Sequence, residues 1–252
     1  MIAAMVWILD LDGVVWLADT LIPGAAEAIA ALRAAGHTVA FATNFSAGTI
    51  GEFDQKLRRF GIEPDGDVVT SAMAVATLVE PGERVLLCAG AGVREALAAR
   101  NVEIVEDGPA DAVVVGYHHT FDYERMRVAS TAAREGARLL ATNDDATYPS
   151  ADGLLPGTGA ILAGIERASG VKAVVAGKPY APTVALIEQR YGREGTMVGD
   201  RPDTDGRLAR ALGYRWALVL TGVTTSLDPT PDPAPDLIAP SLAVLVDREL
   251  HV

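Results

Sequence analysis

Near its start the chain reads Val6-Trp7-Ile8-Leu9-Asp10-Leu11-Asp12-Gly13, an apolar run that ends in two aspartates. The apolar residues are continuous rather than alternating, which is typical of a strand buried on both faces of a parallel sheet. Asp10 and Asp12 stand two residues apart, so their carboxylates lie on the same side of an extended chain. Because ligands bind at the carboxyl ends of strands in open parallel sheets, the stretch predicts a binding site here.

Two like charges at the end of a buried strand repel each other, and a bound cation would offset this repulsion. Hard cations such as Mg2+ prefer carboxylate oxygens as ligands. One carboxylate could then attack an electrophile while the other moves protons. The alternative is an ordinary exit from a strand, with solvated aspartates and a turn at Gly13, since Asp-x-Asp-Gly also occurs in turns.

Along the rest of the chain, short aliphatic or β-branched runs alternate with alanine-rich segments of helical period. This alternation predicts an α/β fold, a doubly wound parallel sheet with helices on both faces and right-handed connections. The predicted strands are residues 6–11, 39–42, 85–88, 112–115, 139–141, 171–176, 196–198, 216–220 and 237–239. The predicted helices are residues 25–35, 50–60, 93–100, 123–135, 160–168, 183–191 and 207–211.

Three more polar clusters follow predicted strands. Phe41-Ala42-Thr43-Asn44-Phe45-Ser46 offers a hydroxyl and an amide ahead of a helix, which suits an anion, although a helix N-cap uses the same residue types. Gly177-Lys178-Pro179 places a compact positive charge at a strand end, although a single lysine is more often solvated. Gly199-Asp200-Arg201-Pro202-Asp203-Thr204-Asp205 brings three aspartates together, which suits a cation better than a turn.

Taken together, the four clusters resemble motifs I to IV of the haloacid dehalogenase (HAD) superfamily of phosphohydrolases. The chain resembles in particular the NagD-like, para-nitrophenylphosphatase-type branch, subfamily IIA. Residues 136–145, 157–160 and 218–225 are similar to that branch as well, so the resemblance covers essentially the whole chain. It implies a Rossmann-like core, residues 1–78 plus 176–252, and an inserted α/β cap domain of the C2 type at residues 79–175.

The resemblance also implies a catalytic chemistry. Asp10 would be the nucleophile that attacks phosphorus and forms an aspartyl phosphate. Asp12 would protonate the leaving oxygen and then activate the hydrolytic water. A Mg2+ ion would be held by the Asp10 carboxylate, the main-chain carbonyl of Asp12 and Asp200.

Further residues take binding and orienting roles by the same resemblance. Thr43, the main chain of Asn44 and Lys178 would hold the transferring phosphoryl group. Asp203 and Asp205 would orient the waters bound to the metal. The positive charges of the metal and the lysine would supply the neutralisation that phosphoryl transfer requires.

Two departures from the family's motifs and three residues of the expected cap bear on which substrate the protein binds. Phe45 stands where the family often has a second asparagine, so a polar contact near the substrate is replaced by an apolar one. Arg201 could bind an anionic substrate if it faced the site, but we expect it in solvent. Asn143 and Asp145 follow a predicted cap strand and could read the substrate. His118 could line the cap side of the cleft, although a partly exposed loop is the simpler interpretation.

The second aspartate narrows the reaction within the superfamily. Haloacid dehalogenases lack it and P-type ATPases place threonine there, so Asp12 favours a phosphatase or a phosphomutase. A mutase usually carries a different, helical cap. The resemblance therefore implies a Mg2+-dependent phosphatase for phosphoglycolate, glycerol phosphate, a sugar phosphate or a nucleoside monophosphate. A phospho-accepting receiver domain, a HAD-type phosphomutase and, more weakly, a nucleotide-binding dehydrogenase domain remain open as alternatives.

Composition limits the partners. The 252 residues carry 21 Lys plus Arg against 33 Asp plus Glu, a formal net charge of −12 at pH 7. This balance argues against nucleic acid and against anionic membrane surfaces as partners. A single cysteine, Cys88, forms no intramolecular disulfide, and the apolar start lacks a basic flank, so we expect a cytoplasmic protein. A homodimer through the cap would be in keeping with the family.

Overall fold

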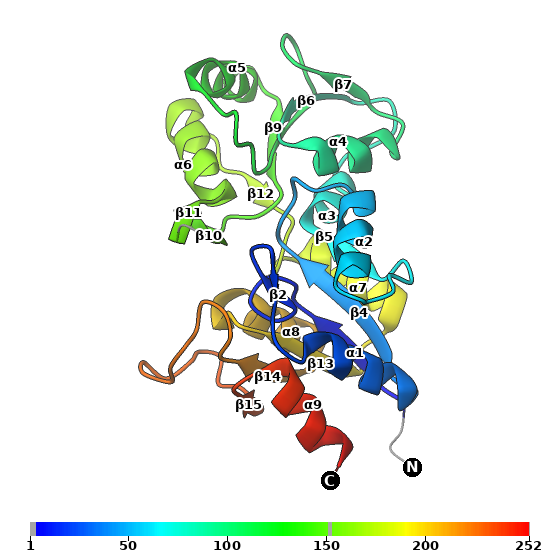
Figure 1. Cartoon of the computed structure of the whole chain (residues 1–252). Coiled ribbons are helices and arrows are strands. Elements are labelled where there is room, and N and C mark those ends of the chain that lie inside the picture. The colour runs from blue at the N-terminus through cyan, green and yellow to red at the C-terminus, as the bar shows by residue number, and fades with distance from the viewer. Residues whose placement is uncertain (1–3, 151–152, 252) are drawn as a thin grey trace.

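The computed structural model of the chain describes residues 4–150 and 153–251. Within this part, the larger sheet has six parallel strands in the order β15-β14-β13-β1-β4-β5, in the lower half of Figure 1. Its strands are β1 (Val6–Leu9), β4 (Thr38–Thr43), β5 (Val68–Thr70), β13 (Gly195–Gly199), β14 (Arg215–Val219) and β15 (Leu237–Ala239). The doubly wound parallel sheet predicted from the sequence is thus confirmed.

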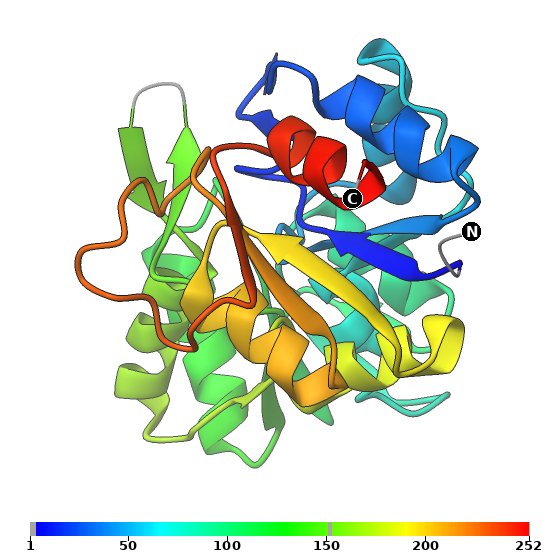
Figure 2. The same cartoon turned by 90° about the horizontal axis from the view of Figure 1, so that it is seen from below.

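Helices bury both faces of this sheet because successive side chains of a strand point to opposite sides. Trp7 and Leu9 belong to one apolar cluster and Ile8 to another, all three nearly inaccessible to water. The first face is covered by α1 (Ala25–Ala34), α2 (Ile50–Arg59) and α9 (Leu242–Leu250), and the second by α7 (Ala181–Tyr191) and α8 (Arg207–Leu212). Figure 2 shows α9, in red, and α8, in orange, on opposite sides of the strands.

A second parallel sheet, in the upper half of Figure 1, has the order β12-β9-β8-β6-β7 in the described part of the chain. Its strands are β6 (Arg84–Cys88), β7 (Glu103–Val105), β8 (Ala112–Val115), β9 (Arg138–Ala141) and β12 (Val174–Val175). One face packs on α3 (Ser71–Ala76) and α4 (Ala91–Ala98), and the other on α5 (Tyr123–Arg134) and α6 (Thr158–Ser169). All five strands lie between residues 79 and 175, whereas α3 precedes this range.

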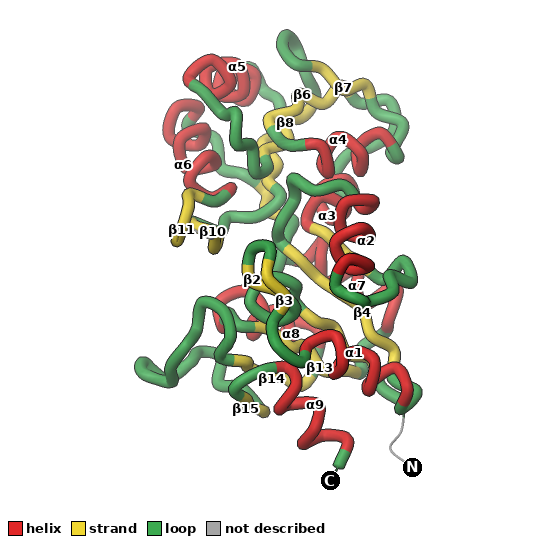
Figure 3. Tube along the Cα trace, viewed as in Figure 1, coloured by secondary structure: helices red, strands yellow, loops and turns green. Residues whose placement is uncertain are grey.

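Some elements are not evident from the sequence pattern, chiefly because they are short. Two antiparallel pairs form, β2 (Trp16–Leu17) with β3 (Thr20–Leu21) and β10 (Thr147–Ser150) with β11 (Gly153–Pro156). The predicted strand 171–176 is reduced to β12. Residues 220–236 carry neither helix nor strand and form the long green loop between β14 and β15 in Figure 3. In the part of the chain that the structure describes, no helix has the length and apolar character needed to span a bilayer.

Candidate active site

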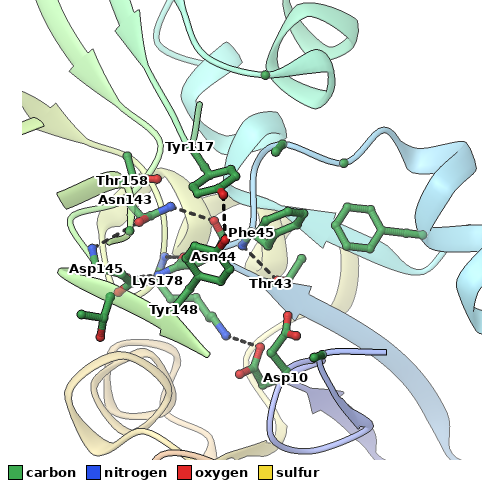
Figure 4. Close-up of a pocket in the computed structure, with 18 of the residues that line it drawn as sticks. Asp10, Thr43, Asn44, Phe45, Tyr117, Asn143, Asp145, Tyr148, Thr158 and Lys178 are labelled. Carbon is green, nitrogen blue, oxygen red and sulfur yellow. Dashed lines mark hydrogen bonds and ion pairs between the residues drawn. The ribbon is translucent and has the colours of Figure 1, made fainter. Parts of the chain in front are cut away.

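The carboxyl ends of three neighbouring strands open onto a cavity of about 900 Å³. Asp10 follows β1, Thr43 ends β4 and Asp200 follows β13, and all three line the cavity. Because β1 pairs in parallel with both β4 and β13, these ends lie at the same edge of the sheet. The fourth predicted cluster arrives from the other sheet, since Lys178 follows β12 by a short loop. Residues of all four predicted clusters thus line one cavity, and Figure 4 shows Asp10, Thr43, Asn44 and Lys178 from three of them.

Lys178 lies between two carboxylates at the bottom of this cavity. Its Nζ is 2.7 Å from Asp10 Oδ1 and 2.7 Å from Asp205 Oδ1, and it donates to the carbonyl of Ala42 at 2.9 Å. Burial alone would lower the pKa of Lys178, but the charges of Asp10 and Asp205 reverse this effect and raise it above its usual value. The lysine therefore carries a full positive charge directly beside the proposed nucleophile.

The carboxylates of Asp10, Asp200 and Asp205 form a compact acidic cluster, with one oxygen of each lying within 4.8 Å of the others. Burial, followed by the charge of Asp205, raises the pKa of Asp200 to about 7. Burial is also the largest cause of a raised pKa at Asp10. Among the described residues, Asp200 Oδ1 is buried without any hydrogen-bond partner. An unpaired buried oxygen within a carboxylate cluster is what a hard cation satisfies, so these residues fit Mg2+.

Two glycines allow the chain to approach Asp200 closely. A Cβ at residue 222 would lie 2.0 Å from Asp200 Oδ2, and one at residue 13 would lie 2.7 Å from it. Gly13 also has a φ of +87°, which other residues rarely adopt. The main-chain N–H of Val223, next to Gly222, donates to Asp200 Oδ2. The position of this carboxylate therefore requires glycine at residues 13 and 222.

Asp12 lines the same cavity and is oriented by a residue that the sequence analysis did not single out. The indole Nε1 of Trp16 donates to Asp12 Oδ1 at 3.1 Å. The ammonium group of Lys56, from α2, lies over the Trp16 ring, 4.4 Å from its centre. Burial raises the pKa of Asp12, which favours the protonated form that an acid catalyst needs. The only sequence signal for this contact is the spacing of four residues between the aspartate and the tryptophan.

The loop after β4 presents Thr43 and Asn44 in different ways. Thr43 Oγ1 accepts the main-chain N–H of Phe45 at 3.0 Å and lies at the cavity wall. The amide of Asn44 ties parts of the chain together, because its Oδ1 accepts the N–H of Lys178 at 2.7 Å and its Nδ2 donates to Asp145 Oδ2 at 3.0 Å. The side-chain amide of Asn44 is thereby used within the protein.

All three residues predicted to read the substrate from the cap line the cavity. Asn143 is buried, and its Nδ2 donates to the carbonyl of Asn44 at 2.7 Å, so it mainly fixes the loop after β4. Asp145 receives the Asn44 amide, and burial raises its pKa. His118 is half-buried and lies 3.0 Å from the hydroxyl of Thr120, with a pKa lowered chiefly by burial.

Arg201 and Asp203, from the fourth cluster, do not lie where the sequence analysis expects them. Arg201 does not lie in solvent: its side chain is 21% exposed and lines the cavity. Asp203 pairs with Arg201 at 3.2 Å, is 59% exposed and does not line this cavity, so the structure does not bring it to the acidic cluster. Asp205 is fully buried, and its Oδ2 accepts the N–H groups of Asp200 and Arg201 at 3.2 and 3.1 Å. Of these two aspartates, only Asp205 is placed to orient groups in the site.

Comparison with known proteins identifies the family. A family model described as haloacid dehalogenase-like hydrolase matches residues 7–103, and a second, HAD-hydrolase-like model matches residues 175–245. The acid sugar phosphatase of Staphylococcus aureus is 34% identical over 229 residues, which cover 88% of each chain. The chain belongs to the HAD-like hydrolases. The resemblance noted in the sequence is thus confirmed.

Solved structures agree on the branch of this family. The p-nitrophenyl phosphatase from Archaeoglobus fulgidus is 31% identical with a TM-score of 0.90, covering 98% of this chain and 100% of its own. The glycerol phosphate phosphatase from Mycobacterium tuberculosis, solved in complex with magnesium, is 33% identical with a TM-score of 0.88, covering 96% of this chain and 76% of its own. This HAD hydrolase therefore belongs with the NagD-like and p-nitrophenylphosphatase-type branch.

Proposed function

We propose that this HAD hydrolase is a Mg2+-dependent phosphatase of small phosphate monoesters that works through an aspartyl phosphate on Asp10. The observation that carries the proposal is the position of the Asp10 carboxylate, 2.7 Å from the buried ammonium of Lys178 and next to the acidic cluster. Asp10, the main-chain carbonyl of Asp12 and Asp200 would hold the metal. Bound there, Mg2+ supplies positive charge that neutralises the phosphoryl oxygens.

The reaction proceeds in two displacements. An oxygen of Asp10 attacks phosphorus, the bond from phosphorus to the ester oxygen breaks, and Asp12 gives its proton to that leaving oxygen. A water then attacks the phosphorus of the aspartyl phosphate, Asp12 takes a proton from it, and inorganic phosphate leaves with the Asp10 carboxylate restored. Both steps balance because the proton that Asp12 donates is returned by the water.

The residues around Asp10 hold the phosphoryl group while these bonds change. Lys178 carries a positive charge beside Asp10, and Thr43 and Asn44 line the same cavity. Asp205 orients Lys178 by accepting from its Nζ at 2.7 Å. Such fixed donors stabilise charge as it develops in the transition state, which is the largest contribution in this class of reaction.

We further propose that residues 79–175 are the cap and that residues 1–78 plus 176–252 are the core. The sheet of β6, β7, β8, β9 and β12 supports this division, because the chain leaves the six-stranded sheet after β5 and returns to it at β13. The cap and the core both supply walls of the cavity, which suits a small substrate. Glycerol phosphate, sugar phosphates, phosphoglycolate and nucleoside monophosphates remain the candidate substrates. The names of the relatives support the first two.

The predictions about the partner, the cellular location and the oligomeric state are also part of this proposal. The net charge of −12 supports a small metabolite rather than nucleic acid or an anionic membrane as partner. Cytoplasmic location and a homodimer through the cap are predictions that cell fractionation and light scattering would test. The receiver-domain and phosphomutase alternatives are not favoured, because the relatives at this level of identity are phosphatases.

The test is phosphate release by the purified enzyme from p-nitrophenyl phosphate and a panel of metabolite esters, with Mg2+ and with EDTA. We expect Mg2+-dependent turnover that Asp10→Asn abolishes. Asp247→Asn is the matched control, because Asp247 is an aspartate with 77% of its side chain exposed. Full activity of Asp10→Asn, or no release from any ester, would refute the proposed function.

A further inference from the structure

The hairpin of β2 and β3 carries the tryptophan that binds Asp12, and it is too short to hold its own position. Each of its strands has only two residues, Trp16–Leu17 and Thr20–Leu21. An isolated two-stranded hairpin is at best marginally stable in water. The turn of this hairpin also includes Ala18 at a φ of +50°, in the left-handed region that alanine rarely adopts. Contacts from outside the hairpin must therefore fix Trp16.

Helix α2 supplies such contacts from one of its faces. Lys56 Nζ donates to the carbonyl of Ala18 at 2.7 Å and lies 4.4 Å from the centre of the Trp16 ring. Phe60, four residues further along the chain, packs on the same ring with centres 6.0 Å apart. Because residues four apart share one face of a helix, the lysine and the phenylalanine reach the hairpin together. Trp16 is left only 1% exposed.

Lys56 is better placed to hold the hairpin than the other basic residue that touches it. Arg59 contacts Asp19 at 3.1 Å, but the side chains of Arg59 and Asp19 are 55% and 86% exposed. Exposed pairs of this kind contribute little to stability. The side chain of Lys56 is 24% exposed, and it meets both the turn carbonyl and the tryptophan ring. The clamp on the hairpin therefore depends mainly on Lys56.

We propose that Lys56 is a positioning residue for the acid catalyst, because it clamps the hairpin and thereby holds the Trp16 indole where its N–H orients the Asp12 carboxylate. The link is continuous, since Trp16 Nε1 donates to Asp12 Oδ1 at 3.1 Å. In this role Lys56 acts through Trp16 and not on the substrate. The catalytic effect rests on the proposed phosphatase function. A well-placed proton matters most for a poor leaving group such as an alkoxide and least for p-nitrophenolate.

The first experiment measures kcat and KM for glycerol phosphate and p-nitrophenyl phosphate in the wild type, Lys56→Met and Lys56→Arg. Methionine removes the ammonium and keeps the apolar stem, whereas arginine keeps a charge and a donor. We expect Lys56→Met to lower kcat about three- to tenfold more for glycerol phosphate than for p-nitrophenyl phosphate, a small part of the roughly 10²–10⁴-fold that a positioned acid contributes. KM should change little, and Lys56→Arg should retain most of the activity. Arg58→Met is the matched control, because Arg58 also lies in α2, is 55% exposed and pairs with Glu63 at 3.8 Å, away from the hairpin.

A double variant tests whether the effect of Lys56 passes through Trp16. In Trp16→Phe the donated N–H is already absent, so adding Lys56→Met should change the ratio of kcat for the two esters by less than about twofold. Full additivity of the two changes would overturn the proposal, because residues that act through one another are not independent. A rise in KM for both esters with kcat unchanged would also overturn it, since Lys56 would then bind the substrate directly.

Hydrogen–deuterium exchange of residues 14–22 measures the clamp without any substrate. Lys56→Met should speed exchange in this segment by about two- to thirtyfold, the factor that a cation–π contact contributes, and Arg58→Met should leave it unchanged. Equal exchange in Lys56→Met and the wild type would overturn the clamp whatever the activity. If neither ester were hydrolysed, the phosphatase function would fail and the catalytic role with it, whereas exchange would still decide whether Lys56 holds the hairpin.

Discussion

Replacing Lys178 by methionine tests the electrostatic arrangement of the site. The side chain of Lys178 is 3% exposed and contacts Asp10 and Asp205, each at 2.7 Å. Methionine has a similar length and no charge, so the change removes the ammonium while leaving the apolar stem. It leaves two buried carboxylates facing each other without the cation between them.

The expected loss of stability in Lys178→Met depends on the contacts that Asp10 and Asp205 each keep after the substitution. Removing one partner of a buried ion pair costs about 3–5 kcal/mol, because the other charge stays buried and unpaired. Asp205 keeps the N–H groups of Asp200 and Arg201, and Asp10 borders the open cavity, so both retain part of their stabilisation. We therefore expect the free energy of unfolding to fall by about 3 kcal/mol, the lower end of that range. We also expect kcat to fall by roughly 10²–10³-fold, as for the loss of one preorganised group.

The assay is urea unfolding in EDTA, so that bound Mg2+ does not offset the repulsion. Lys172→Met is the matched control, because the Lys172 side chain is 87% exposed and pairs with Glu166 at the surface. Such an exposed pair contributes about 0–1 kcal/mol. The double variant Lys178→Met/Asp205→Asn should lose less stability than Lys178→Met, since one of the repelling charges is gone. A fall in unfolding free energy no larger for Lys178→Met than for Lys172→Met would refute the reasoning.

The remaining predictions concern the metal, the glycines and the acid. Adding Mg2+ should raise the thermal unfolding temperature of the wild type and leave that of Asp200→Asn nearly unchanged, because the cation binds the folded carboxylate cluster; equal shifts would contradict the assigned ligand. Gly222→Ala should weaken Mg2+ binding in a titration, since its Cβ would meet Asp200 at 2.0 Å, whereas Gly51→Ala, in α2 with no atom within 4 Å, should stabilise the protein by up to about 1 kcal/mol. Trp16→Phe removes the N–H donated to Asp12 and should lower kcat more for glycerol phosphate than for p-nitrophenyl phosphate, because only the poorer leaving group needs a well-placed proton; equal loss on both would contradict a positioning role.

The fold was predictable wherever a segment is long and buried on both sides. Such a strand reads as a continuous apolar run, and the predicted 112–115 coincides with β8, while 39–42 differs from β4 by one residue at each end. The two antiparallel pairs could not be predicted from the sequence. Strands β2 and β3 have only two residues each, and β10 contains Pro149, a residue type whose presence argues against a strand. Strand 171–176 was predicted too long because its apolar residues cover the edge of the second sheet, where only Val174–Val175 pair.

The site was predictable at the ends of the strands. Asp10, Thr43 and Asp200 each end or follow a strand, and adjacent parallel strands bring such ends together. The environment of Arg201 was not predictable, because whether a loop arginine meets solvent or a cavity depends on what the second sheet places opposite it. The resemblance implies an orienting role for Asp203, but its side chain is 59% exposed and pairs with Arg201.

By itself, the sequence determined the type of sheet and the four polar clusters, and its resemblance to the HAD superfamily implied the chemistry of Asp10, Asp12 and Lys178. These depend on local pattern and spacing, which a chain carries before it folds. Only the tertiary structure decided that Lys178 lies between Asp10 and Asp205, and that Phe45 shares one wall with rings from distant segments. The physical reason is that burial, charge pairing and ring packing act through space between residues up to 168 positions apart in the chain. Local sequence constrains which residues can belong to the active site, and tertiary packing determines which of them come into contact.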